Sequence, residues 1–331
     1  MMKVTSLTHM PERALNRWIL RIAAILVVGL IAFGAFYFLD RYRAPSPSIV
    51  DRSITTLEEA VRANPEDVTA RGQLADTYYA AGRFEAAIAQ YDAIIESGNE
   101  LELAHFGRAK SNQALGLLDE AAADFEFVVD FAKGGEMANV DPLLNASYFG
   151  LGAIALEQGR PDDAVTHLTA AVRINRGDAD SLNLLGSALL QTGEPEQAIE
   201  ALRKAVAFVP LGWVEPYTTM AQAYAEVGLQ DRAEWASAMA DLSAGDAEQA
   251  RTRLLAITDG EAALDAAIGL ALIAEREGDS PTAVEWYLKA LAIDPDNAAA
   301  RLGFGRVSDP DATIAPLPEL PVPGAGDGGN G

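Results

Sequence analysis

The chain has 331 residues and a formal net charge of −23, half of its residues are apolar, and it has no cysteine. Disulfides, a catalytic thiol and a cysteine-ligated metal are therefore excluded. Residues 1–43 hold more basic than acidic residues, so the excess of acid belongs to the rest of the chain. We expect that acidic body to repel nucleic acid and anionic lipid headgroups.

A polar, mildly basic tail, residues 1–17, precedes a long apolar run. No residue from Ile22 to Leu39 is charged, and apolar residues extend the run back to Trp18, so residues 18–40 are predicted to form a single transmembrane helix. A cleaved signal peptide is the alternative, although the apolar run continues past a passable cleavage site at residues 32–34. Slightly more basic residues precede the span than follow it, which favours a cytoplasmic N-terminus and an extracytoplasmic body.

Two stretches rich in proline flank the body. Residues 41–51 are predicted to be a linker, because they contain the stiff sequence Ala-Pro-Ser-Pro-Ser at 44–48. Residues 308–331 hold five prolines and five glycines with little apolar material, and we predict a disordered tail. Within that tail, the segment 316–323 contains four prolines. It could serve as a polyproline ligand or be a plain flexible end, and the sequence leaves both interpretations open.

The body contains an internal repeat that is clearest at residues 148–210. Small and apolar residues there recur 34 residues later: Leu151 as Leu185, Gly152 as Gly186, Gly159 as Gly193, Ala164 as Ala198, Leu168 as Leu202, and Ala171 as Ala205. Such a period indicates an array of helical pairs that bury their apolar faces against one another. We expect the glycine or alanine positions to let helices approach closely, the leucines to fill the seam, and Gly159 and Gly193 to end the first helices.

The period, the Leu-Gly pair, the alanine positions and Pro210 after the second helix together resemble the tetratricopeptide repeat (TPR) family. This resemblance implies an all-α fold, a right-handed superhelical solenoid of TPR helix pairs, here with one N-terminal transmembrane helix. The register extends over residues 52–307 and predicts about six repeats plus a capping helix. The array opens on a single helix at 52–63 and closes on the capping helix at 297–307.

Three places depart from a regular array. Arg108 and Asn112 stand where leucine and tyrosine are usual in the family. About nine residues are inserted near 133–136, and they are followed by Asp141-Pro142, which resembles a helix cap with a first-turn proline. One surplus helix is expected between 229 and 277, with helices at 229–243, 246–258 and 261–277 whose pairing the sequence does not decide.

No pattern of residues indicates catalysis or metal binding. The three histidines, His9, His105 and His167, share no metal-ligand spacing. We therefore predict a protein that is not an enzyme and has no cofactor or metal. An enzyme would need a site built in the groove from Asp, Glu, Tyr and Lys alone.

The groove is the predicted functional site. In the TPR family the first helices line the concave face, and carrying the ligand-facing repeat positions onto this chain gives Tyr79, Phe106, Lys110, Phe149, Asn183, Ser187, Gln191 and Gln222. This mixed aromatic and amide lining suits a peptide held by stacking and hydrogen bonds. Phe106 and Phe149 have an alternative role in packing between units. Gly72 and Asp76 stand where clamps for a C-terminal carboxylate carry other residues, so such a clamp is not expected.

The resemblance to membrane-anchored bacterial TPR proteins implies a scaffold or adaptor that holds a protein or peptide partner near the membrane. Assembly of an envelope complex fits this role, and cytochrome c maturation is one example. The alternative is a cytoplasm-facing regulator that recruits a soluble enzyme to the membrane. The sequence predicts no nucleic-acid partner and leaves self-association open.

Overall fold

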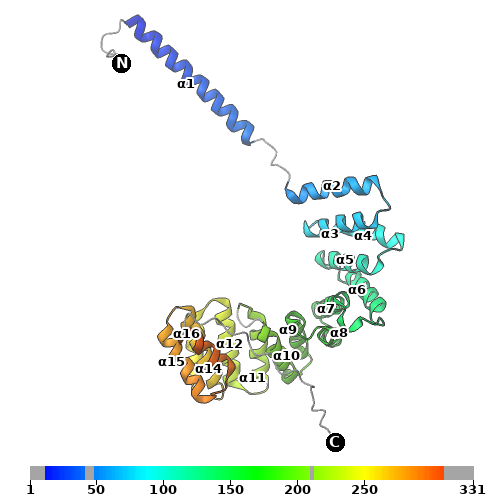
Figure 1. Ribbon diagram of the computed structural model, residues 1–331, viewed down its shortest axis with the longest axis vertical. Coiled ribbons are helices and arrows are strands. Elements are labelled where there is room, and N and C mark those ends of the chain that lie inside the picture. The colour runs from blue at the N-terminus through cyan, green and yellow to red at the C-terminus, as the bar shows by residue number, and fades with distance from the viewer. Residues whose placement is uncertain (1–11, 42–47, 209–211, 309–331) are drawn as a thin grey trace, which may run out of the picture. The chain divides into compact units, whose positions relative to one another are not determined.

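The computed structural model describes residues 12–41, 48–208 and 212–308, and every regular element within these ranges is a helix (Figure 1). Most of the predicted N-terminal tail, most of the linker, Pro210 and nearly all of the predicted C-terminal tail lie outside the described residues. The chain divides into two compact units, Met1–Asn64 and Pro65–Gly331. The all-α prediction is confirmed.

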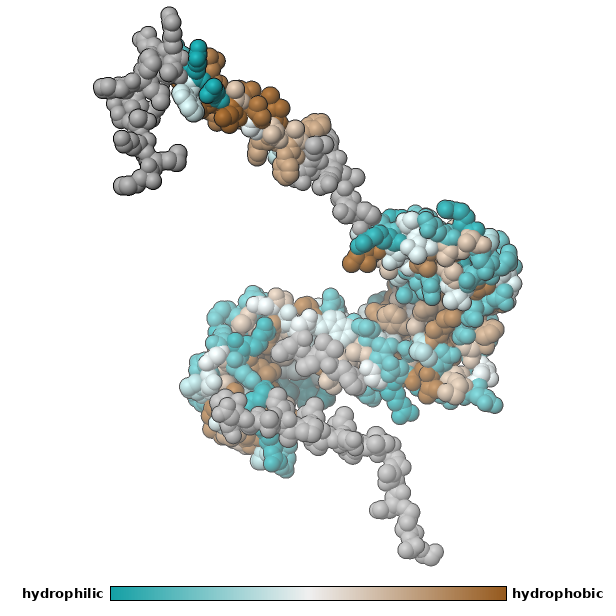
Figure 2. All heavy atoms as spheres, turned by 45° about the horizontal axis from the view of Figure 1, so that its top comes forward, coloured by the Kyte–Doolittle hydropathy of each residue, from teal (hydrophilic) through white to brown (hydrophobic). Residues whose placement is uncertain are grey.

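Helix α1 (Glu12–Arg41) contains the predicted span. Its segment Asn16–Phe38 has a mean hydropathy of 2.5 over its most apolar window, and none of that window is buried inside the protein. A helix of this length rises about 35 Å, enough to cross a hydrocarbon core of about 30 Å. Figure 2 shows hydrophobic residues gathered along α1, whereas hydrophilic and hydrophobic residues are intermixed on the visible face of the rest of the protein.

Helix α2 (Ile49–Ala63) begins earlier than the predicted residue 52. Ser48 and Asp51 form a capping box, in which the Asp51 amide donates to the Ser48 hydroxyl at 3.0 Å and the Ser48 amide donates to the Asp51 carboxylate at 3.3 Å. Residues 49–51, predicted to belong to the linker, are therefore the first turn of a helix. The capping box satisfies two amide groups that would otherwise have no partner.

The second unit is a series of helices joined mostly by short turns, in which consecutive helices pack against each other. They are α3 (Val68–Ala80), α4 (Phe84–Ser97), α5 (Leu101–Ala114), α6 (Leu118–Ala132), α7 (Pro142–Glu157), α8 (Pro161–Ile174), α9 (Ala179–Gln191), α10 (Pro195–Phe208), α11 (Val214–Glu226), α12 (Gln230–Ala244), α13 (Ala247–Ala256), α14 (Ala263–Arg276), α15 (Ser280–Ile293) and α16 (Ala298–Ser308).

The predicted close contact between paired helices is present. A Cβ atom added at Gly152 would lie 2.4 Å from the Leu168 side chain, and one at Gly186 would lie 2.5 Å from Leu202. Both leucines are fully buried. Gly159, which follows α7, has a φ of 69°, so its left-handed conformation ends the first helix of the pair as expected.

The insertion after α6 is a turn followed by a single 3₁₀ turn, η2 (Ala138–Val140). Asp141 then caps α7 by accepting hydrogen bonds from the amides of Leu143 at 2.8 Å and Leu144 at 3.2 Å, with Pro142 as the first helical residue. The predicted cap is confirmed. The Asp141 carboxylate supplies partners for amides at the start of α7, and proline suits the first helical position because the amide it lacks would have no partner there.

The surplus helix is α13. Helix α12 packs against both α11 and α13, while α14 pairs with α15. The buried residues of α12 lie on opposite sides of the helix, with Ala233, Ala236 and Ala240 on one side and Ala238 and Leu242 on the other. Helix α12 therefore serves as the second helix for α11 and the first helix for α13, so both pairings that the sequence left open are present.

Candidate functional site

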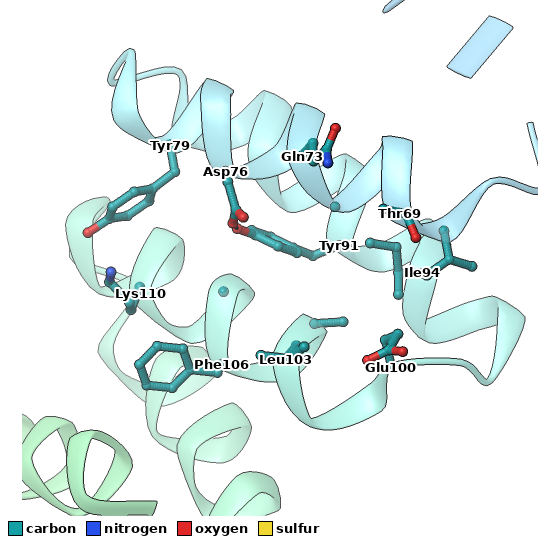
Figure 3. Close-up of a pocket in the computed structure, with 14 residues that line it drawn as sticks. Thr69, Gln73, Asp76, Tyr79, Tyr91, Ile94, Glu100, Leu103, Phe106 and Lys110 are labelled. Atoms are coloured by element: carbon teal, nitrogen blue, oxygen red, sulfur yellow. Dashed lines mark hydrogen bonds between the residues drawn. The ribbon is translucent and has the colours of Figure 1, made fainter. Parts of the chain in front are cut away.

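A cavity of about 500 Å³ lies between α3 and α5, with Tyr91 and Ile94 of α4 against its inner side (Figure 3). We call it the α3–α5 pocket. Its lining residues are Val68, Thr69, Gly72, Gln73, Asp76, Tyr79, Tyr91, Ile94, Glu100, Leu103, Ala104, Phe106, Gly107 and Lys110.

Three predicted groove residues, Tyr79, Phe106 and Lys110, meet in this pocket. The Lys110 ammonium lies 4.6 Å from the centre of the Tyr79 ring and 5.8 Å from the centre of the Phe106 ring. Both rings attract the cation through their π faces. Within the described helices Lys110 forms no ion pair with a carboxylate, so its charge is open to a ligand.

Tyr91 fixes the inner wall. Its hydroxyl donates to the Asp76 carboxylate at 2.6 Å, and its ring lies where a Cβ atom on Gly107 would be only 2.3 Å away. Glycine at 107 is thus required for the ring to lie against α5. Burial, together with the hydrogen bond to Asp76, raises the pKa of Tyr91 above its usual range. The hydroxyl therefore remains a donor, and it holds Asp76 in place at neutral pH.

Glu100 and Lys110 lie at opposite ends of the pocket (Figure 3). Glu100 precedes α5 and has a φ of 45°. In the described part of the chain it is the only residue other than glycine that has a positive φ. Its side chain makes no capping hydrogen bond to α5. Holding a non-glycine residue in this conformation stores strain of about 1–3 kcal/mol, and such strain occurs preferentially at functional sites.

A second hollow of about 380 Å³ adjoins the first and shares Glu100 and Leu103 with it. Glu102 and Phe131 contribute to its lining. The side chains of Leu103 and Phe131 are 55% and 62% exposed. An acidic and apolar surface therefore continues from the α3–α5 pocket around the start of α5.

A buried polar cluster on the other side of α5 accounts for the departure from the family pattern. Arg108 donates to both oxygens of Asp124 on α6, at 2.8 and 2.7 Å, and to Asp92 on α4 at 2.6 Å. Asn112 and His105 also contact Asp124, at 3.4 and 2.7 Å. Because Asp124 is almost fully buried, its charge needs these donors. The cluster ties α5 to α4 and α6, and so fixes one wall of the pocket.

The other predicted groove residues lie outside this pocket. Phe149 on α7 is half-buried and packs against the large hydrophobic cluster that includes Leu182 and Leu185, which favours its alternative role in packing. Phe106 has both roles, because it lines the pocket and contacts Phe125 edge-on, with ring centres 5.9 Å apart. Asn183, Ser187 and Gln191 on α9 and Gln222 on α11 do not line the pocket, and their role in binding stays a prediction.

Sequence reasoning missed Leu103, Glu100 and Tyr91 as pocket residues. Leu103 lies three residues before Phe106 and seven before Lys110, so the helical period places all three on one face and could have found it. Glu100 lies in a turn and Tyr91 on a second helix, so no periodicity connects them to the groove. In the part of the chain that the structure describes, no three His, Asp or Glu side chains form a group that could hold a metal ion.

Comparison with known proteins agrees with this architecture. The family model described as tetratricopeptide repeat matches residues 50–102, 73–135, 149–212 and 236–298, more than half of the chain. No curated protein matches the chain in sequence.

Solved structures of several proteins are similar to parts of this chain at low identity. The MamA protein is 23% identical, covers 56% of this chain and 96% of its own, and has a TM-score of 0.47. YrrB, described as a TPR protein with an unusual peptide-binding site, is 20% identical. The match covers 60% of this chain and 96% of YrrB, with a TM-score of 0.49. The C-terminal part of a TPR repeat-containing protein from Cytophaga hutchinsonii is 16% identical. The match covers 77% of this chain and 94% of that structure, with a TM-score of 0.49. On the match to the family model, the chain belongs to the tetratricopeptide repeat family.

Proposed function

We propose that this protein is a membrane-anchored TPR scaffold or adaptor that binds a protein or peptide partner in the α3–α5 pocket. The observation that carries the proposal is the pocket itself, a cavity of about 500 Å³ where Tyr79, Phe106 and Lys110 converge, and Lys110 forms no ion pair within the described residues. A concave, mainly apolar site with a few convergent polar groups is typical of a binding site. The size and the aromatic lining suit side chains of a peptide segment.

The membrane anchor is the second part of the proposal. Helix α1 has the length and hydropathy of a transmembrane span, and the acidic body gives the protein little other attraction to anionic lipids. With a cytoplasmic N-terminus, the body lies outside the cytoplasm and presents its partner to an envelope assembly process, of which cytochrome c maturation is one example. With the opposite topology, the same pocket serves the alternative role of recruiting a soluble enzyme to the membrane.

Photo-crosslinking in the native host tests the binding proposal. A photoreactive residue at Gln73, which is exposed and lines the pocket, should capture a defined partner, whereas the same residue at Glu85, exposed on α4 away from the pocket, should not. The substitution Leu103→Asp should reduce capture at Gln73 about tenfold, because losing one apolar contact and desolvating a carboxylate costs at least about 1.4 kcal/mol. Equal capture at Gln73 and Glu85, or capture unaffected by Leu103→Asp, would contradict a role for the pocket.

A further inference from the structure

We infer that the segment bound in the α3–α5 pocket has opposite charges at its two ends: a basic side chain beside Glu100, a bulky apolar side chain in the middle, and a carboxylate beside Lys110. The inference rests on the proposed function, since it describes the occupant of the same pocket.

The Lys110 end requires an anion. In the described part of the chain the ammonium lies over the rings of Tyr79 and Phe106 and forms no ion pair, although the protein carries a net charge of −23. A ligand that enters the pocket removes water from this ammonium. Taking a charge out of water is unfavourable unless a counter-charge replaces the water. A carboxylate of the ligand supplies that counter-charge.

The Glu100 end requires a cation. Glu100 and Glu102 both lie at the start of α5, and neither forms an ion pair within the described residues. Burial and the nearby charge of Asp141 raise the pKa of Glu102, as expected where carboxylates gather without a cation. Leu103 and Phe131 flank these carboxylates and remain largely exposed. They offer an apolar surface for the stem of a lysine or the plane of an arginine.

The middle of the pocket is apolar. Ile94, Leu103, Ala104 and Phe106 line it, and the nearby carboxylate of Asp76 already accepts a hydrogen bond from Tyr91. A bulky apolar side chain would therefore pack against these four apolar residues. The charge pattern gives the bound segment one orientation, because the reversed segment would place like charges together at both ends.

The length of α5 sets the spacing of the charges. Glu100 immediately precedes α5 and Lys110 lies ten residues further along, so the helix between them rises about 15 Å along its axis. An extended ligand rises about 3.3 Å per residue and would span this distance in four to five residues. A helical ligand would need about ten.

This pattern disfavours the protein's own C-terminal tail as the occupant. Residues 309–331 contain acidic residues and several prolines but no lysine or arginine, so the tail has no basic side chain for Glu100. We therefore assign the pocket to a segment of another protein that carries both charges.

Selection from a phage-displayed library of random 12-residue peptides tests the inference. The full-length protein in detergent micelles serves as bait, and the enriched peptides are sequenced. We expect them to carry a basic and an acidic residue separated by four to five or by about ten positions, with a bulky apolar residue between.

Charge variants of the pocket make the test specific. Lys110→Met should lower the enrichment of the acidic residue about fivefold, the effect of losing a charge pair worth about 1 kcal/mol. The apolar preference should remain. The double variant Glu100→Lys/Glu102→Lys should replace the preference for a basic residue with one for an acidic residue. Glu85→Lys on α4 is the matched control, and it should leave the selected pattern unchanged.

Two further outcomes separate this inference from the proposed function. Peptides that are lost with Leu103→Asp but carry no paired charges would overturn the charge pattern and leave the pocket as the binding site. Peptides that survive Leu103→Asp, or no enrichment at all, would count against both. Enrichment of proline-rich acidic peptides without a basic residue would overturn the inference in favour of the tail.

Discussion

At the scale of single residues, the packing follows a rule that pairs a glycine with a large side chain. Gly152 and Gly186 accommodate leucines from the second helix of their own unit. Gly107 and Gly303 instead accommodate the rings of Tyr91 and Tyr287 from the preceding helix. Both arrangements bring a helix backbone against a bulky side chain, because no Cβ stands between them.

Gly186→Ala and Gly72→Ala should change stability in opposite directions. Both glycines lie inside helices, where alanine is intrinsically favoured by about 1 kcal/mol. A Cβ at position 186 would clash with the buried Leu202, and overpacking of this kind costs about 1–3 kcal/mol. A Cβ at position 72 would meet only Ile94, at an ordinary 3.9 Å. Thermal unfolding of the full chain should show a lower Tm for Gly186→Ala and a higher Tm for Gly72→Ala.

A rise in Tm for both variants would show that the contact between α9 and α10 tolerates a methyl group, and would contradict the close packing described above. Because Gly72 lines the α3–α5 pocket, its alanine variant also reports whether the pocket can be narrowed without loss of partner capture.

At the scale of helices, irregular positions arise where a helix meets neighbours on more than one side. Helix α12 is apolar on opposite faces because α11 and α13 cover both. Helix α5 combines a face that lines the α3–α5 pocket with a face whose side chains donate hydrogen bonds to Asp124. Each of these two helices departs from the repeat pattern because its residues must suit different surroundings on its two faces.

The attachment of α16 should depend on pH. Arg306 on α16 donates to Glu275 on α14 at 2.7 and 2.8 Å, and the Tyr287 hydroxyl donates to the same carboxylate at 2.9 Å. The hydrogen bonds from Arg306 outweigh partial burial and lower the pKa of Glu275 below its ordinary 4.5. The stabilisation is thus present above pH 4.5 and is lost as the pH falls through the lowered pKa.

Amide hydrogen exchange, corrected for its intrinsic dependence on pH, should show protected α16 amides at pH 7 and faster exchange of these amides at pH 3. In the Glu275→Gln variant the ion pair is absent at both pH values. The difference in α16 amide exchange between pH 7 and pH 3 should therefore be smaller in this variant than in the unmodified protein. Unchanged protection of α16 between pH 7 and pH 3 in the unmodified protein would contradict the role of this ion pair.

At the scale of the whole molecule, we propose that the apolar helix α1 anchors the protein and that the acidic body binds the partner. The body has far more acidic than basic residues, and α1 supplies an uncharged run from Ile22 to Leu39. Charge repels the body from anionic lipid, while α1 favours the hydrocarbon. A protein built in this way would stand off from the bilayer and remain attached to it.

The anchored state has a measurable consequence. In the native host the protein should remain in the membrane fraction after an alkaline carbonate wash, with an intact mass near 35.1 kDa. The double variant Leu26→Lys/Leu30→Lys should be released, because each charge at the centre of a span costs about 2.5–3.5 kcal/mol for insertion. A shorter, soluble product that lacks the residues of α1 would instead identify a cleaved signal peptide.

The sequence by itself determined the repeat architecture of this protein. The 34-residue spacing of Gly152 and Gly186 and the cap at Asp141 depend on local chemistry and on a period, both of which can be read along a chain. The same reading predicted Tyr79, Phe106 and Lys110 as groove residues, and these three line the α3–α5 pocket.

Only the tertiary structure decided which groove residues share a cavity and what the irregular positions do. Phe149 occupies a groove position in the repeat, yet it packs against the core, because burial depends on neighbours far away in sequence. Tyr91 and Asp124 gain their roles from side chains on other helices, 15 or more residues away in the sequence. Periodicity fixes the face of a helix on which a residue lies, whereas packing between helices decides what that face meets.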